Sequence, residues 1–358
     1  MGKTVTELQE FTECLVCGSK NAHVIVDNSE LTSERKYLDH FWRKLYYPNT
    51  PDYLLKDHVF FSHDYDAQLV SCKNCGLVCR NPRWSPNQAL RAFAQDEYHP
   101  EWLEAYYQPY RQAFLPEMPR LIRKLGKNAH VLEIGSYVGG FLAAAQENGW
   151  EAQSVDIGQT LSSFARSKGF NVFTGTLLDA HFPDSHFDAV FVWLCFEMLP
   201  NPQDDLREIH RILSNGGWLF ISVPNGEFIS LIHKLSKPRL FRDKIWKLLA
   251  YGILLGFPFQ LAYTPASIKY LLSRSKFDSI SVRDQFYVPL TSPEHVYPWV
   301  IREKERYLKL LHYFTQSIYQ LSFHRMVIGP WMEICCRKKV NWWKSATSDS
   351  VSSRKIGS

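Results

Sequence analysis

Two pairs of cysteines in the N-terminal part of the chain have a spacing that suits a metal ion. Both pairs are Cys-x-x-Cys sequences followed by glycine, and their members are Cys14, Cys17, Cys72 and Cys75. Zn²⁺ prefers tetrahedral coordination by thiolates, and each pair can present two sulfur atoms to one ion. Gly18 and Gly76 would let the backbone turn beneath the metal. We therefore expect a structural Zn²⁺ site with no open coordination position, and a core position for the nearby Cys79.

A second chemical signature lies in the sequence EIGSYVGG, residues 133–140. Its glycines would allow a ligand to approach the backbone closely, and the N-terminus of the helix predicted to follow favours a polar or negatively charged group. Tyr137 stands where the dinucleotide motif Gly-x-Gly-x-x-Gly has its second glycine, which disfavours an NAD-dependent oxidoreductase. Glu133 and Asp156 each end a predicted strand. A carboxylate at the position of Asp156 can accept hydrogen bonds from both ribose hydroxyls of an adenosine.

Short β-branched segments alternate with helical patterns in the part of the chain that contains these acidic residues. The alternation is typical of a parallel sheet with crossover helices, and therefore of an α/β fold. The predicted strands are 130–135, 151–156, 171–175, 187–194, 218–225, 279–286 and 332–339. The predicted helices are 139–150, 160–170, 202–217 and 264–277, with a helical insertion over 292–322 before the last strand.

The run from VLEIGSYVGG to WLFISVPN, residues 131–225, resembles the core of class I S-adenosylmethionine-dependent methyltransferases and keeps four family motifs in order. The resemblance implies a Rossmann-like seven-stranded sheet, S-adenosylmethionine as cofactor and methyl transfer as the reaction. It assigns the methionine end of the cofactor to the glycine turn, the ribose to Asp156, and an apolar wall beside the adenine to Leu177. Many relatives have an acidic residue where this chain has Thr176. The expected cofactor-binding residues are Glu133, Gly135, Ser136, Tyr137, Gly139, Asp156, Ile157, Thr176, Leu177 and Trp193.

The segment CKNCGLVCRNPRW, residues 72–84, is similar to the zinc-ribbon-like N-terminal part of bacterial methyltransferases that modify sugars and related polar metabolites. This similarity implies a module that packs over the cleft and a small polar acceptor, namely a sugar, a glycan precursor or a related metabolite. The expected organisation is a zinc-binding module (1–85), a helical linker (86–127), the methyltransferase domain (128–340) and a disordered Ser-rich tail (341–358).

The catalytic group is less clearly marked in the sequence. Relatives often have Glu-His just after the fourth strand, where this chain has Glu197 and Met198. Glu197 is therefore the candidate catalytic residue, either as a general base or through its charge facing the sulfonium. His186 and His295 are other possible bases, and relatives also have a histidine where this chain has Gln260. The sequence leaves the base undecided.

The distribution of charge helps to decide between methylation of a small molecule and methylation of a nucleic acid. The formal net charge is +5, but the basic residues are spread over 234–247, 302–309 and 337–344, and a nucleic-acid binder more often concentrates them in one stripe. A zinc-containing nucleic-acid methyltransferase is therefore the weaker alternative, and a protein that binds S-adenosylmethionine without catalysis is another.

The sequence also bears on location. The N-terminal residues MGKTVTELQE are polar and lack the apolar region of a signal peptide, so we expect a cytoplasmic protein. The most apolar stretch, 245–263, is interrupted by Lys247, two glycines and Pro258, and it fits a membrane span poorly. We expect a buried helix pair or a substrate lid there, with peripheral membrane contact as the minority option. The oligomeric state is left open.

Overall fold

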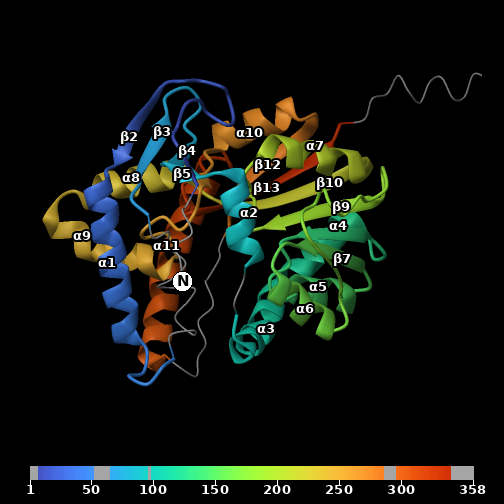
Figure 1. Cartoon of the computed structure of the whole chain (residues 1–358), viewed down its shortest axis with the longest axis horizontal. Helices are drawn as coiled ribbons and strands as arrows, with labels where there is room; N and C mark the ends of the chain where they lie inside the picture. The colour runs from blue at the N-terminus through green and yellow to red at the C-terminus, as the bar shows by residue number, and fades with distance from the viewer. Residues whose placement is uncertain (1–6, 52–64, 96–97, 286–295, 340–358) are drawn as a thin grey trace, which may run out of the picture.

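The computed structural model describes residues 7–51, 65–95, 98–285 and 296–339 (Figure 1). Its centre is a mixed sheet with the strand order β12-β13-β10-β9-β6-β7-β8. The strands are β6 (His130–Ile134), β7 (Glu151–Asp156), β8 (Asn171–Thr174), β9 (Phe187–Trp193), β10 (Leu213–Pro224), β12 (Phe277–Gln285) and β13 (Trp331–Lys338). β13 is antiparallel to both of its neighbours, whereas β8, β7, β6, β9 and β10 pair in parallel. The predicted α/β fold with seven strands is therefore confirmed, but the sheet is mixed rather than wholly parallel, because β13 runs against both of its neighbours.

Helices cover both faces of this sheet. Successive side chains of a strand point to opposite faces, and β9 shows this clearly. Val190 and Val192 pack with α7 (Pro202–Ile212) and α10 (Pro265–Arg274). Ala189 and Phe191 pack with α4 (Met118–Leu125), α5 (Gly140–Glu147) and α6 (Gln159–Ser167). The apolar strand pattern thus produces two separate cores, one on each side of the sheet.

The predicted boundary of one helix was wrong. The helix expected over 202–217 ends at Ile212, and the following residues already belong to β10. The pairing of β10 with β9 shifts register between Leu213 and Trp218. A Cβ on Gly217 would lie 2.9 Å from the Ser214 carbonyl oxygen and 3.1 Å from that of Asp188. The glycine therefore allows the strand to bulge against its neighbour rather than ending the helix.

The predicted helical insertion before the last strand is confirmed as α11 (Pro298–Leu321), although residues 292–295 of the prediction lie outside the described part. The predicted start of α10 is also confirmed. Thr264 accepts a hydrogen bond from the Ser267 backbone N–H, and Ser267 accepts one from the Thr264 N–H, so the two residues form a capping box ahead of Pro265. The tail predicted at 341–358 lies outside the described residues.

The cysteine pairs lie beside a second, four-stranded sheet with the order β11-β4-β3-β2. Its strands are β2 (Ala22–Val26), β3 (Gln68–Cys72), β4 (Val78–Asn81) and β11 (Leu261–Ala262), and a two-stranded pair, β1 (Leu8–Gln9) with β5 (Arg83–Trp84), lies nearby in sequence. Because β11 comes from much later in the chain, this sheet ties the N-terminal segment to the domain that follows. Helices then occupy the predicted linker: α2 (Pro86–Ala94), α3 (Pro100–Phe114), η3 (Leu115–Glu117) and α4.

A helical lobe packs on the face of the second sheet that is opposite the cysteine cluster, and it lies at the left of Figure 1. It consists of α1 (Asn28–Leu45), α8 (Gly226–Ser236), α9 (Arg239–Tyr251) and α11, which share one apolar core. The apolar stretch 245–263 forms the end of α9 and β11, and Leu249, Tyr251 and Phe257 from it are buried. In the described ranges, no helix is both long enough and apolar enough to cross a bilayer.

Candidate active site and cysteine cluster

The glycine turn lies between β6 and α5, at the carboxyl edge of the parallel strands. Gly135 and Gly139 have φ values of 77° and 79°, a region that side chains with a Cβ rarely adopt. A Cβ on Gly135 would lie 2.9 Å from the Cys195 Sγ, and one on Gly140 would lie 2.6 Å from the Tyr110 Cβ. The sequence analysis explained these glycines by the close approach of a ligand to the backbone. The structure shows that packing within the protein also requires it.

An aromatic helix covers this turn. Trp102 of α3 is buried between Tyr98 and Tyr106, with ring centroids 4.7 Å and 4.3 Å away. Tyr137 of the turn places its ring edge-on to Trp102 at 5.5 Å and lies 4.8 Å from Tyr110. The sequence prediction assigned no role to these α3 side chains. Their spacing of four residues was a usable signal, because it places them along one side of a helix.

Two carboxyl groups flank the glycine turn. The Asp156 carboxylate, at the end of β7, accepts hydrogen bonds from the Tyr137 N–H at 3.0 Å and from the Gly158 N–H at 2.9 Å. Glu133, in β6, is buried, and among the described residues its Oε2 has no hydrogen-bond partner. Burial, followed by the charge of Asp156, raises the pKa of Glu133 well above its usual value. The structure thus brings together both acidic residues that the sequence singled out.

The segment expected beside an adenine has a partner that the sequence prediction missed. The Asp179 carboxylate accepts hydrogen bonds from the Thr176 hydroxyl at 2.6 Å and from the Thr176 N–H at 3.1 Å. Both bonds hold the pKa of Asp179 below its usual value, and the bond from the Thr176 hydroxyl has the larger effect. Leu177 is buried in the core on the α7 side of the sheet, while Leu178 is half exposed.

The remaining cofactor-binding predictions lie on the same edge of the sheet. Ser136 is buried in the glycine turn, and Ile157, which directly follows Asp156, is partly buried. Trp193, at the end of β9, packs against Phe114 and Phe141. These positions surround the carboxyl ends of β6, β7 and β9, where parallel α/β sheets bind ligands.

Glu197 lies just beyond β9 and is fully buried, without a hydrogen-bond partner for its Oε2 in the part of the chain that the structure describes. Burial raises the pKa of Glu197 to about 8. Burial also raises the pKa of Asp205, in the first turn of α7, to about 7. The Cys195 thiol has a raised pKa, first from burial and then from the charges of Glu197, Asp156, Asp205 and Glu133. Acidic groups therefore surround this edge of the glycine turn.

The other candidate bases do not join this cluster. His186 precedes β9 and packs against His130 at the start of β6, with ring centroids 4.5 Å apart. It therefore lies at the amino ends of these strands, opposite the glycine turn, and the suggestion that it acts as a base was wrong. Gln260 accepts a hydrogen bond from the Trp84 N–H. His295 lies outside the described residues.

The buried carboxyl of Glu197 leads to a prediction about pH and stability. Between about pH 4.5 and pH 8 the folded protein keeps the Glu197 proton while the unfolded chain loses it, so ionisation opposes folding increasingly as the pH rises. Glu197→Gln removes this contribution. We expect the difference in Tm, variant minus wild type, to grow by roughly 5–10 °C between pH 5 and pH 8.5, measured by thermal unfolding. The exposed Glu151→Gln is the control, and an equally flat difference for both variants would contradict the prediction.

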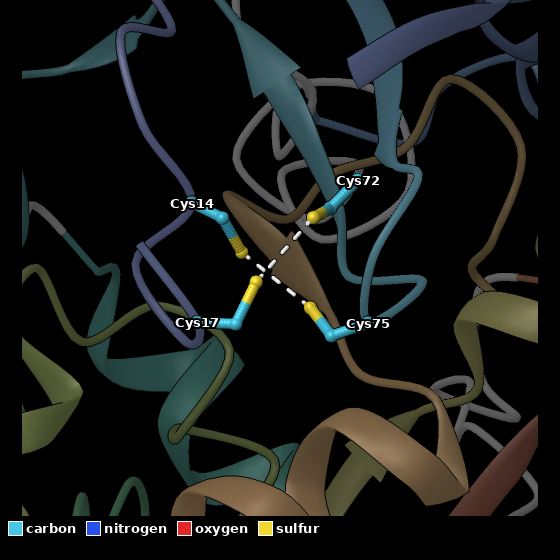
Figure 2. Close-up of side chains that lie close together, drawn as sticks. All are labelled: Cys14, Cys17, Cys72 and Cys75. Carbon is cyan, nitrogen blue, oxygen red and sulfur yellow. Dashed lines mark hydrogen bonds between the residues drawn. The ribbon is translucent and has the colours of Figure 1, made fainter. Parts of the chain in front are cut away.

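The four paired cysteines meet in one cluster, and Figure 2 shows their sulfur atoms converging on a common point. All four Sγ atoms lie within 4.8 Å of one another, with Cys14 and Cys75 at 3.5 Å and Cys17 and Cys72 at 3.6 Å. The two loops have the same backbone hydrogen bonds. Gly18 donates to the Cys14 carbonyl and Gly76 to the Cys72 carbonyl, both at 2.8 Å. The cluster can hold one four-coordinate metal ion.

Other residues join the cysteine cluster to the rest of the molecule. The Thr264 hydroxyl, at the start of α10, donates to the Cys75 carbonyl at 3.0 Å. The Gln203 side chain in α7 donates to the Leu15 carbonyl at 2.8 Å. Cys79 lies outside the cluster and is buried, as predicted, and its burial raises its pKa to about 12. The cluster is thus fastened to α7 and α10, which cover one face of the central sheet.

Comparisons with known proteins concern the part of the chain that contains the glycine turn. Residues 102–275 match the family model described as a methyltransferase domain. The demethylmenaquinone methyltransferases of two Tropheryma whipplei strains are each 27% identical to the chain over 145 residues, 39% of this chain and 56% of the relative. The chain therefore matches about half the length of these curated relatives.

The solved structures that resemble the chain have lower sequence identity to it than these relatives have. A possible histamine N-methyltransferase of Thermotoga maritima is 17% identical and has a TM-score of 0.42, with 70% of this chain and 100% of that chain covered. Phosphoethanolamine N-methyltransferase 2 of Haemonchus contortus is 17% identical and has a TM-score of 0.46, with 74% and 62% covered. The assignment rests on the family model and the curated relatives. Residues 102–275 are thus similar to known methyltransferase domains, and they contain β6 to β10 of the Rossmann-like sheet.

Proposed function

We propose that the chain transfers a methyl group from S-adenosylmethionine to a small polar acceptor, namely a sugar, a glycan precursor or a related metabolite. The observation that carries the proposal is the pair of buried carboxyl groups beside the glycine turn. Two backbone N–H groups orient the Asp156 carboxylate, and a carboxylate at this strand end can accept hydrogen bonds from the hydroxyls of a ribose. Glu133 adds a buried acidic group that can accept from a cationic ammonium.

The residues of the chain would bind the two reactants, align them and keep water out. S-adenosylmethionine, when bound, supplies a methyl group that is already activated by its sulfonium. Alignment can therefore contribute much of the rate, about 7–11 kcal/mol in the most favourable cases. Trp102 and Tyr106 of α3, which are buried above the glycine turn, would exclude water from the cofactor side.

Glu197 is proposed as the group that faces the reacting centre. Because burial raises its pKa to about 8, this carboxyl is protonated at neutral pH. It can take a proton from a hydroxyl group of the methylated substrate only as the pH rises through that value. General base catalysis is typically worth about 10²–10⁴-fold. Met198, where relatives often have histidine, cannot provide it. If Glu197 is the base, methyl transfer to a hydroxyl acceptor should be faster above pH 8 than at pH 7.

We further propose that the cysteine cluster holds a structural Zn²⁺. A tetrahedron with Zn–S bonds of about 2.3 Å has sulfur atoms about 3.8 Å apart. The sulfur separations of 3.5 Å and 3.6 Å are close to this value. Four thiolates leave no coordination position for a substrate. The metal would therefore stabilise the second sheet, and the reaction would take place at the glycine turn.

The proposal is tested by calorimetric titration of the full chain with S-adenosylhomocysteine and, separately, with NAD⁺. We expect micromolar binding of the first ligand and none of the second. Failure of the folded protein to bind S-adenosylhomocysteine would overturn the proposed cofactor. Transfer of labelled methyl groups would then be compared between sugar nucleotides and RNA. Transfer to RNA alone would favour the nucleic-acid alternative, and cofactor binding without transfer to any acceptor would favour a protein that only binds the cofactor.

A further inference from the structure

The elbow between α8 and α9 exposes a group of large apolar side chains. Leu231 and Leu235, near the end of α8, are 53% and 50% exposed. Leu240 and Phe241, in the first turn of α9, are 81% and 53% exposed. Single exposed apolar residues are common on protein surfaces, but a group of this kind indicates an interaction site.

The packing of α8 and α9 within the lobe leaves these apolar side chains facing the solvent. Leu231 and Leu235 are four residues apart and share one face of α8, while His233, on another face, is buried. The His233 Nδ1 lies 3.0 Å from the Glu34 Oε1 of α1, and both side chains are buried, so this pair joins α8 to α1. On α9, Trp246 is buried in the lobe instead.

Basic residues alternate with the apolar ones along the elbow. Residues 231–244 include a single acidic residue, Asp243, and five basic ones, Lys234, Lys237, Arg239, Arg242 and Lys244. All five except Arg242, which is partly buried, are exposed. Asp27, which caps α1, and Glu30 in its first turn interact electrostatically with Lys237, so they offset one of these charges. The elbow remains basic after this offset.

We propose that the elbow, residues 231–244, docks on an anionic lipid surface. Apolar side chains flanked by Lys and Arg match the boundary between negatively charged head groups and acyl chains. Each basic residue near such a surface contributes about fivefold to partitioning. Figure 1 shows α9 at the margin of the molecule, on the side away from α5 and α6, so a flat surface can reach it. This docking does not depend on the proposed reaction.

The test is co-sedimentation of the full chain with two kinds of vesicle, one of phosphatidylcholine alone and one that also contains phosphatidylglycerol. We expect binding to the anionic vesicles only, and a marked decrease at high ionic strength because salt screens the charges. The double variant Arg239→Glu with Leu240→Ser should bind at least about tenfold more weakly. The matched control is Lys269→Glu with Tyr270→Ser, an adjacent basic and aromatic pair that is exposed on α10.

Each outcome decides the proposal. Selective loss of binding in the elbow variant, with both variants keeping the wild-type circular dichroism spectrum, would support it. Equal binding to neutral vesicles, no binding to either kind, or equal losses in the two variants would overturn it. A concentration-dependent dimer that only the elbow variant abolishes, without vesicle binding, would instead assign the elbow to a second copy of the chain.

Discussion

Replacement of Cys72 by serine is expected to abolish binding of the zinc ion proposed for the cysteine cluster and to lower the Tm by about 10 °C or more. Structural Zn²⁺ sites contribute roughly 10–16 kcal/mol in zinc-finger peptides, and a whole domain is stable by only about 5–15 kcal/mol. Cys72 also ends β3, and its N–H donates to the Leu77 carbonyl at 2.9 Å, so loss of the metal would loosen the second sheet. Metal content per chain and thermal unfolding measure the two effects.

The matched control is Cys79→Ala, which removes another buried thiol seven residues further along. Cys79 lies in the neighbouring strand β4 but outside the cluster of four sulfur atoms. Its variant should keep one zinc ion per chain and lose only the stability expected from a small core change. Zinc retained by Cys72→Ser, or lost equally from both variants, would contradict a four-cysteine site.

Replacement of Asp156 by asparagine is expected to weaken binding of S-adenosylhomocysteine at least about 100-fold. Hydrogen bonds to a charged group are worth roughly 1.5–3 kcal/mol each, and the proposed carboxylate would accept two from the ribose. The amide would also bring an NH₂ group against the N–H of Tyr137 or of Gly158, both of which now donate to the carboxylate. Calorimetry on the folded variant measures the loss.

The control for Asp156→Asn comes from the other end of the same strand. Glu151 begins β7 at the edge opposite the glycine turn, and its side chain is 77% exposed. Glu151→Gln removes the same kind of charge from the same strand and should leave the affinity unchanged. If Asp156→Asn binds as tightly as the wild type, the carboxylate does not hold the ribose and the proposed binding site is wrong.

Local sequence patterns predicted most of the elements of the domain that contains the glycine turn. The central strands, such as β6 and β9, are apolar runs between turn residues, and the helices that follow them carry a separate 3.6-residue pattern. The boundary between α7 and β10 was predicted less well, because the glycine pair 216–217 looks like a helix stop when the contacts of Gly217 with Ser214 and Asp188 are unknown. Sequence spacing likewise brought out Asp156 and the glycine turn, since both depend on short motifs.

The cysteine pairs, the glycine turn and the succession of strands and helices along the chain were determined by the sequence itself, because residue type and local spacing suffice for them. Only the tertiary structure decided that His186 lies at the far edge of the sheet, that β11 completes the sheet beside the cysteine cluster, and that Trp102 covers the glycine turn. These features join segments that are distant in the chain. No local pattern specifies such contacts, and they form only when the apolar faces of separate elements are buried together.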